Sequence, residues 1–173
     1  MVSNAQIQNK ILDFTLGTTT IEDIKEKYPK ATGNWAGDID RAIYPGSELH
    51  GNVTEGEPAL NIKNIKFAGI DWEYVSCMFY RGKLCEFTFS SKDHPEYSTW
   101  IELCNALSNK YKKYQLASEE ENGAKYLIFS DGTTRIIACF YNLYSEVDFF
   151  TLNYQHVSLF QKKFQKKIDP SEL

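Results

Sequence analysis

Residues 75–89 read VSCMFYRGKLCEFTF, and the alternation of apolar and polar side chains around Arg-Gly predicts two antiparallel strands joined by a tight turn. The length of the turn decides the pairing, because a shift of one residue moves every side chain to the other face. A three-residue loop, residues 80–82, sets Cys77 opposite Cys85 and makes one face apolar. A two-residue loop sets Cys77 beside Glu86. The apolar pattern therefore favours the three-residue loop.

In that register Cys77 and Cys85 are cross-strand neighbours and form a candidate disulfide. Their Cβ atoms would lie about 4.5–5.5 Å apart, beyond the roughly 3.8 Å of a relaxed disulfide. A bond between Cys104 on a predicted helix and Cys139 on a predicted strand is a second option. Free cysteine is among the most buried residue types, so the favoured interpretation is four core thiols. Metal binding is disfavoured, because no close-spaced ligand pairs occur.

The other face of this hairpin combines large aromatic side chains and a thioether with polar groups, a composition typical of interfaces. The alternative is that another part of the chain covers it. Its members are Trp72, Tyr74, Ser76 and Met78 on the first strand and Leu84, Glu86 and Thr88 on the second.

Residues 31–58 form a long segment with five glycines and two prolines and no sustained periodicity. Loops longer than about 15 residues are uncommon in compact domains and are usually functional or disordered. Aromatic residues argue against disorder here. We therefore expect Trp35, Tyr44 and His50 to join the hairpin face, giving the candidate binding residues Trp35, Tyr44, His50, Trp72, Tyr74 and Met78.

Helical periodicity occurs on both sides of the hairpin. Thr19 and Glu22 have capping-box spacing and predict a short helix that Pro29 ends. Residues 93–114 predict the longest helix, with Asp93 as its cap. Its apolar stripe consists of Tyr97, Trp100, Ile101, Cys104, Leu107 and Tyr111.

Strand patterns fill most of the remaining chain. They occur at residues 11–16, 60–67, 71–80, 83–89, 124–129, 133–141 and 147–154. The segment ASEEENG predicts an acidic turn, and residues 157–169 predict a C-terminal amphipathic helix with a stripe of Val157, Phe160, Phe164 and Ile168.

The order of elements predicts one domain, residues 1–173, with an α+β fold and an internal repeat. Residues 10–90 would form a helix-plus-three-strand unit with the long loop 31–58, and residues 93–156 a second such unit. The C-terminal helix would be residues 157–169. We expect the two helix-plus-three-strand units to form an antiparallel sheet with helices packed on one face.

Length and charge limit the function classes. The 173 residues are enough to bury one sizeable core without a metal or disulfide. A net charge of −4 argues against nucleic acid, whose binding needs a clustered basic surface. Apolar runs stay short of the roughly 20 residues that a membrane span needs. We expect a monomer.

The first residues suggest export. Val2-Ser3-Asn4-Ala5 before Gln6 has the small residues that precede a Gram-negative signal-peptide cleavage site. This predicts a periplasmic or secreted protein of bacterial origin whose Met1 was added to a shortened chain. A natural cytoplasmic start and a tag remnant are the alternatives.

Catalytic motifs are missing from the sequence. It has no G-x-S-x-G, H-E-x-x-H, P-loop or dinucleotide fingerprint. The three histidines, His50, His94 and His156, are scattered. Only His50 with a cysteine could supply a base and a nucleophile. We therefore expect a protein that is not an enzyme and uses no cofactor or metal, with a hydrolase using His50 as the least favoured option.

The segment FTLGTTTIEDIKEKYP resembles the opening of small exported αβββ-type proteins, namely BamE-like outer-membrane-assembly lipoproteins and the tandem-repeat β-lactamase inhibitor proteins. The residues that carry the resemblance are Phe14, Leu16, Gly17, Thr19 and Ile24, together with the duplicated order of elements. Those proteins begin each unit with two helices, whereas one is expected here. The resemblance implies an exported binding or scaffold module without catalysis.

Two functions follow as expectations. The first is a non-catalytic exported binding or scaffold module that recognises a protein or glycan through the long loop and the aromatic sheet face. The alternative is a cytoplasmic inhibitor or immunity-type protein that neutralises a toxin or defence enzyme.

Overall fold

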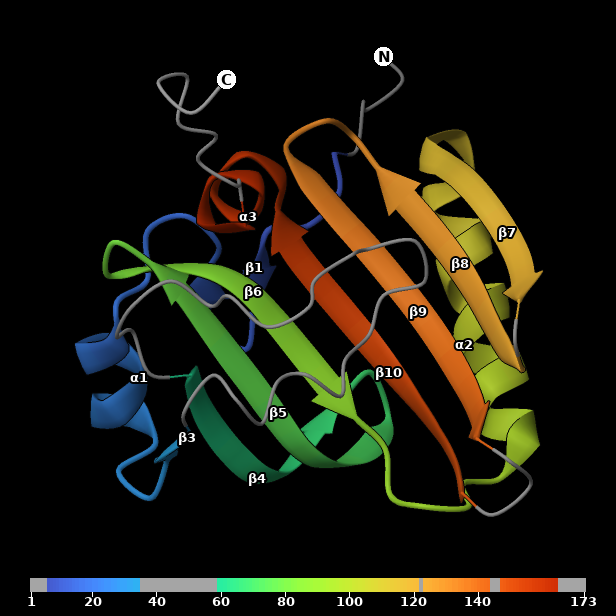
Figure 1. Ribbon diagram of the computed structural model, residues 1–173, viewed down its shortest axis with the longest axis horizontal. Helices are drawn as coiled ribbons and strands as arrows, with labels where there is room; N and C mark the ends of the chain where they lie inside the picture. Colours follow the sequence, from blue (N-terminus) through green and yellow to red (C-terminus); the bar gives the residue numbers. More distant parts are fainter. Residues whose placement is uncertain (1–5, 35–58, 122, 144–146, 165–173) are drawn as a thin grey trace, which may run out of the picture.

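The structure, a computed structural model, describes residues 6–34, 59–121, 123–143 and 147–164 (Figure 1). This part of the chain forms one eight-stranded antiparallel sheet with the strand order β3-β4-β5-β6-β10-β9-β8-β7. Its strands are β3 (Thr32–Asn34), β4 (Ala59–Phe67), β5 (Ile70–Tyr80), β6 (Lys83–Ser90), β7 (Gln115–Glu121), β8 (Ala124–Ser130), β9 (Thr134–Leu143) and β10 (Val147–His156). The helices are α1 (Ile21–Lys27), α2 (Tyr97–Tyr111) and α3 (Val157–Phe164), with a 3-10 turn at Lys112–Tyr114.

The antiparallel sheet is confirmed, but the prediction of an α+β fold made of two helix-plus-three-strand units is wrong. The described chain is mainly β, with few helices, and α1 and α2 are each followed by four strands. The strands that the sequence pattern missed are β3 and β7, which form the two edges of the sheet. An edge strand tolerates charge and needs no apolar alternation. For this reason the glutamates of β7 were mistaken for an acidic turn.

The centre of the sheet is the pairing of β6 with β10. Phe89 lies opposite Leu152, and Phe87 lies opposite Tyr154. Consecutive strands pair on either side of this centre, so that β3–β6 and β7–β10 are two four-stranded meanders. Strands from distant parts of the sequence therefore meet in the middle, where their side chains are covered by neighbours on both sides.

The main hydrophobic core lies on one face of this sheet, which we call the inner face. Figure 1 shows α2 behind β8 and β9. The core cluster contains Ile24 of α1, the buried side chains of α2 and alternate residues of the central strands. In α2 the buried residues are Trp100, Leu103, Leu107 and Tyr111.

Two helix predictions need correction. The residue before the first turn of α2 is Glu96 rather than Asp93, and Tyr97 and Ile101 of the predicted stripe are exposed while Leu103 is buried. The capping box of α1 is formed by Thr20 and Asp23, one residue later than predicted. Three successive threonines offer the same chemistry at neighbouring positions, so spacing alone could not select the cap.

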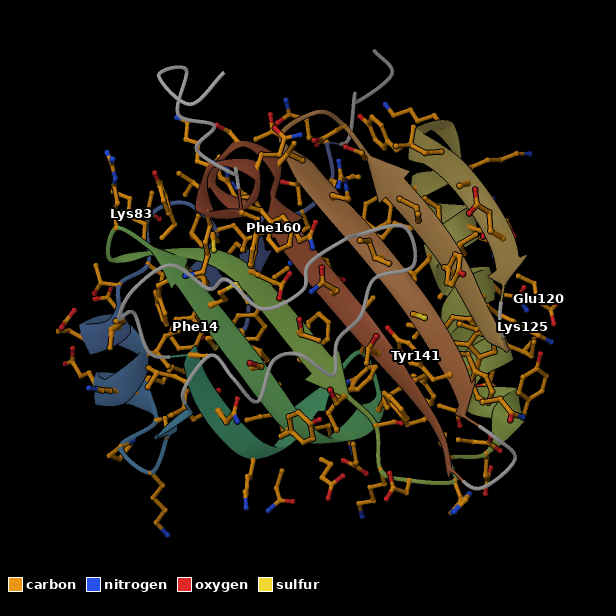
Figure 2. The ribbon with its side chains drawn as sticks, in the orientation of Figure 1. Phe14, Lys83, Glu120, Lys125, Tyr141 and Phe160 are labelled. Atoms are coloured by element: carbon orange, nitrogen blue, oxygen red, sulfur yellow. The ribbon has the colours of Figure 1, made fainter. Side chains whose placement is uncertain are left out.

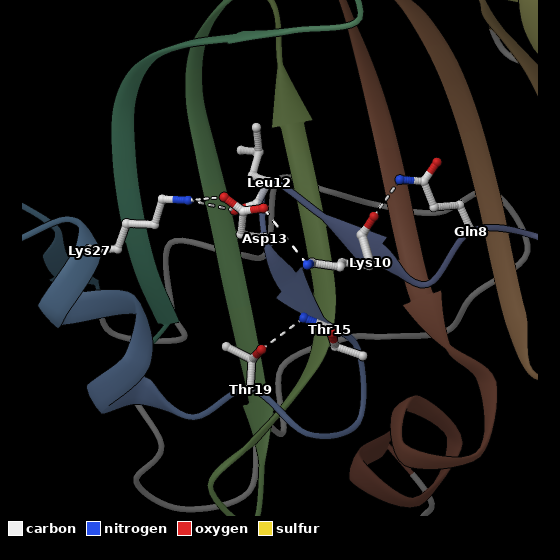
Figure 3. A network of polar contacts seen from close by, with 7 residues as sticks. All are labelled: Gln8, Lys10, Leu12, Asp13, Thr15, Thr19 and Lys27. Atoms are coloured by element: carbon white, nitrogen blue, oxygen red, sulfur yellow. Dashed lines mark hydrogen bonds and ion pairs between the residues drawn. The ribbon is translucent and has the colours of Figure 1, made fainter.

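The predicted strand at residues 11–16 is a small hairpin instead (Figure 3). Its strands β1 (Lys10–Ile11) and β2 (Phe14–Thr15) are two residues long. Leu12 and Asp13 turn the chain with φ angles of 51° and 70°. The Asp13 carboxylate accepts from the Lys27 ammonium of α1, so the hairpin is tied to that helix.

The β5–β6 turn also differs from its prediction. Tyr80 pairs with Lys83 across a two-residue turn, in which Arg81 and Gly82 have φ angles of 50° and 75°. The register then shifts between Met78 and Phe79, which leaves Cys85 as the extra residue of a β-bulge. The bulge restores an apolar inner face after a two-residue turn.

Helix α3 follows β10 directly and lies at the end of the sheet near β5 and β6 (Figure 1). His156 accepts the Leu159 N–H through Nδ1, which caps the first turn of α3. Lys163 is buried and donates to the Phe79 carbonyl. The rest of the predicted helix, including Ile168, lies outside the described residues.

Candidate functional site: the outer face of the sheet

The face of the sheet opposite the main core, here called the outer face, combines polar and aromatic side chains. It is built by strand alternation, because the neighbours of these residues in sequence, such as Val75, Phe87 and Leu152, belong to the core. Its members are Asn61 and Lys63 on β4, Tyr74, Ser76 and Met78 on β5, Glu86, Thr88 and Ser90 on β6, Thr151, Asn153 and Gln155 on β10, Arg135, Cys139 and Tyr141 on β9, and Tyr126 on β8.

A row of amide and hydroxyl side chains crosses the centre of the outer face. Asn61, Ser76, Thr88 and Asn153 are consecutive cross-strand partners on β4, β5, β6 and β10. We call these four residues the polar row. The amide of Asn153 donates to the Thr88 hydroxyl over 2.5 Å. The row therefore joins both meanders of the sheet through side chains.

Glu86 extends this network beside the polar row. Its carboxylate accepts from the Thr88 hydroxyl at 3.2 Å and from the Gln155 amide at 2.9 Å. Glu86 and Gln155 are directly opposite one another on β6 and β10, and both are buried. A carboxylate removed from water needs such donors, because an uncompensated buried charge is costly.

Three polar atoms on this face are buried without a hydrogen-bond partner in the described chain. They are the Oδ1 atoms of Asn61 and Asn153 and the Nε atom of Arg135. Asn153 is only 1% exposed. Each unpaired buried group costs about 1–3 kcal/mol, so such positions are expected to meet a complementary group. Two acceptors and one donor on the outer face are thus both buried and unpaired.

A second, smaller cluster lies toward β8. Ala124, Tyr126, Cys139 and Tyr141 are buried together, and the Tyr141 ring stacks on Phe149 with centroids 4.6 Å apart. Figure 2 labels Tyr141 at its place on β9. Burial raises the pKa of Tyr141 and raises the pKa of Cys139 to about 12. Both groups therefore stay protonated at neutral pH.

The outer face is open near β4 and β5. The side chain of Tyr74 is 39% exposed, and Lys63, its cross-strand partner on β4, is exposed as well. Ser90 lies opposite Tyr74 on the other side. The adjacent pair Asn61 and Ser76 is half-buried. The groups that a partner can reach here are Tyr74 and Lys63.

Of the predicted binding residues, Tyr74 lies exposed on the outer face, and Met78 lies on the same face but is buried. Trp72 does not belong to it. Asn64 has a φ of 56°, and the following pair, Ile65 and Trp72, turns toward the core. Trp35, Tyr44 and His50 lie outside the described residues.

Trp72 is a core residue for clear physical reasons. Its side chain is 1% exposed and lies against the rings of Phe89 and Phe150, with centroids 5.3 and 5.4 Å away. The indole N–H donates to the Phe67 carbonyl at 3.1 Å. Leu84, also predicted for the outer face, is in the core as well because of the bulge at Cys85.

All four cysteines are free thiols. Cys77 lies opposite Phe87 rather than Cys85, so the register that suggested a disulfide does not occur. Burial raises the pKa of Cys77, and it raises the pKa of Cys104 to about 11. A high pKa disfavours the thiolate, which is the reactive form of a cysteine nucleophile.

Across the described ranges, no group of three or more histidine, cysteine, aspartate or glutamate side chains could hold a metal ion. His94 is exposed, and His156 is engaged in capping α3. Among the helices described, none is long and apolar enough to cross a membrane.

Comparisons of the chain with protein-family models, with curated proteins and with solved structures found no match.

Sequence reasoning found part of this site. The alternation of Glu86 and Thr88 with phenylalanines places both on the outer face. It could not show that Asn153 and Gln155 lie beside them, because β6 and β10 are separated by more than fifty residues. The matching alternation in TLNYQ, residues 151–155, was the available signal.

Proposed function

We propose that this chain is a non-catalytic binding module that recognises a protein or glycan through the outer face of its sheet. The observation that carries the proposal is the exposed ring of Tyr74 beside Lys63 on the outer face, next to the half-buried Asn61 and Ser76 of the polar row. The buried members of the row, with Glu86 and Gln155, continue on the same face at the middle of the sheet. Apolar side chains would fill a face that serves only packing at a lower free-energy cost, because every donor and acceptor of a buried polar network needs its own hydrogen-bond partner.

The setting of Tyr74 and Lys63 supports recognition. They stand on β5 and β4 of the sheet, and hydrogen bonds among the buried side chains of the same face tie the neighbouring strands β6 and β10 together. Binding groups fixed on a rigid scaffold lose little conformational entropy when a partner arrives. The exposed Tyr74 adds an aromatic contact of the kind that is enriched at interfaces.

The raised thiol pKa values favour binding over covalent catalysis. Cys104 and Cys139 have pKa values of about 11 and about 12, so the thiolate fraction at neutral pH is very small. A cysteine nucleophile requires the opposite shift.

The test is a matched pair of substitutions. Tyr74→Ala removes an exposed ring from the outer face, and Tyr97→Ala removes a ring that is 46% exposed on α2. Each protein is immobilised and tested against extracts of the source cells by quantitative mass spectrometry and against a glycan array. We expect ligands that the wild type and Tyr97→Ala retain and Tyr74→Ala loses. Equal retention by both variants would contradict a binding role for the outer face.

A further inference from the structure

We propose that His156 is a pH-sensitive latch, which holds α3 against the end of the sheet at neutral pH and releases it in acid. The latch goes beyond the proposed binding function and does not depend on it. His156 is the last residue of β10 and directly precedes α3, which lies near β5 and β6 (Figure 1). Its side chain is half-buried, so protons from the solvent can reach it.

The contact that carries the inference joins the imidazole to the first turn of α3. The Nδ1 atom of His156 accepts the backbone N–H of Leu159 at 3.3 Å. This is the usual N-cap arrangement, which satisfies one of the donors that the start of a helix leaves free. Nδ1 can accept only while the imidazole is neutral and carries its proton on Nε2. The cap therefore exists in one protonation state.

The turn that precedes α1 fixes the orientation of the ring. A Cβ atom added to Gly17, whose φ is 89°, would lie 2.8 Å from Cδ2 and 3.1 Å from Nε2 of His156. The Gly17 N–H donates to the Leu84 carbonyl at 2.8 Å, which ties this turn to β6. One edge of the ring thus faces Gly17 and Nδ1 faces α3. The ring has little room to turn away when it gains a proton.

Protonation changes both the hydrogen bond and the charge at this position. In the imidazolium both ring nitrogens are donors, so Nδ1 can no longer accept the Leu159 N–H. The new positive charge also lies at the N-terminus of α3, where the helix dipole disfavours cations. Histidine ordinarily gains its proton between about pH 8 and about pH 5. One proton therefore acts against α3 in two ways in mild acid.

Most charged groups on the elements around His156 are cations. The only charged side chains of α3 are Lys162 and Lys163. Residues 15–19, which include Gly17, carry no charge. The cations of the neighbouring strands are Lys83, which is exposed at the start of β6, and Arg135, which follows the cross-strand partner of His156 on β9. None of these groups offsets an imidazolium charge.

The two acids on the neighbouring strands and their turns are engaged elsewhere. Asp131, in the turn before β9, accepts the N–H groups of Ile7 and Thr134. Glu86 of β6 accepts from the Gln155 amide on the outer face. In the part of the chain that the structure describes, His156 forms no ion pair with a carboxylate. A protonated ring therefore gains no compensating partner in its present place.

The other contacts of α3 depend on its first turn. The helix is eight residues long, and isolated helices of this length are marginal in water. Near its end, the buried Lys163 ammonium donates to the Phe79 carbonyl of β5. The rings of Phe160 and Phe164 lie against each other with centroids 4.7 Å apart. We expect loss of the cap to loosen these contacts and to uncover the end of β5.

Hydrogen exchange measured by mass spectrometry tests the latch. Protection factors of a peptide that spans residues 157–164 are compared at about pH 7.5 and about pH 5, each relative to the exchange rate of the unfolded chain at that pH. We expect the wild type to lose about tenfold in protection of α3 in acid, as the loss of a cap at an unfavourable helix dipole predicts. Protection of α2 should change little.

Three variants isolate the imidazole. His156→Asn keeps a side-chain acceptor that takes up no proton, and asparagine is a preferred N-cap residue, so α3 should stay protected at both pH values. His156→Ala has no acceptor and should show low protection at both. His94→Asn is the matched control, because His94 is exposed and its φ of 52° is tolerated by asparagine. It should respond to pH as the wild type does.

The titration of the ring gives a second readout on the wild type. The Cε1–H resonance of His156 is followed by NMR, and its midpoint should coincide with the midpoint of the loss of α3 protection. Unchanged α3 protection in acid, an equal loss in His156→Asn, or two different midpoints would each overturn the latch. If His156→Asn caps α3 poorly at both pH values, the two wild-type midpoints and the His94→Asn control decide.

Discussion

Both faces of the sheet are buried at its centre, yet they are held by different forces. On the inner face Phe87 and Phe89 are fully buried among aromatic and aliphatic groups. On the outer face Glu86 and Thr88, their neighbours on the same strand, are also buried but make hydrogen bonds to β10 and to each other. Burial alone therefore does not mark the apolar core. The two faces differ in the contacts that hold them, which are apolar packing on the inner face and hydrogen bonds on the outer face.

The largest effect is expected on the inner face. Trp72→Ala removes a fully buried indole and its hydrogen bond to the Phe67 carbonyl. We expect it to lower the free energy of unfolding by about 3–5 kcal/mol, the usual cost of truncating a buried tryptophan. Urea denaturation followed by circular dichroism measures the change.

Tyr74→Ala is the matched control, because Tyr74 lies two residues away on the same strand and is exposed. It should cost less than about 1 kcal/mol, as surface substitutions usually do. Similar losses of unfolding free energy in Trp72→Ala and Tyr74→Ala would contradict the difference in burial between these two side chains.

A middle-sized effect is expected from the buried polar network. Glu86→Ala leaves the Gln155 amide and the Thr88 hydroxyl without their acceptor, which should cost about 1–3 kcal/mol. A double-mutant cycle with Gln155→Ala should show a coupling energy of about 0.5–3 kcal/mol, because the two side chains are in direct contact. Additive single and double losses would show that the network does not stabilise the outer face.

Sequence patterns predicted the long strands well, because β4, β5, β6, β8, β9 and β10 alternate or are rich in β-branched and aromatic residues. They failed where a single residue changes the alternation. Asn64 has a left-handed φ, and the cross-strand pair that follows it, Ile65 and Trp72, lies in the core; the bulge at Cys85 turns Leu84 inward. Neither irregularity leaves a periodic signal in the sequence. For this reason Trp72 and Leu84 were predicted on the outer face, whereas the structure has them in the core.

The prediction of the fold class was wrong for a related reason. The edge strands β3 and β7 are short or charged, and pairing with β4 and β8 satisfies their backbones. Since such strands owe their structure to a neighbour rather than to their own side chains, local propensity cannot reveal them. The candidate site shares this limit, because it depends on the meeting of β6 with β10.

The smallest effect is expected at an exposed polar pair, which sharpens the contrast with the buried network. The Lys27 side chain lowers the pKa of Asp13 by donating a hydrogen bond to it, and both side chains are well exposed. Because the folded-state pKa lies below the unfolded one, the stabilisation is present above the ordinary aspartate range and is lost as the pH falls through the folded-state pKa. Asp13→Asn should therefore melt slightly below the wild type at pH 7, and the two should melt together in acid. Solvent screening keeps this difference well below that of Glu86→Ala. A larger loss of stability in Asp13→Asn than in Glu86→Ala would contradict the expectation that burial strengthens the contribution of a polar contact to the stability of this protein.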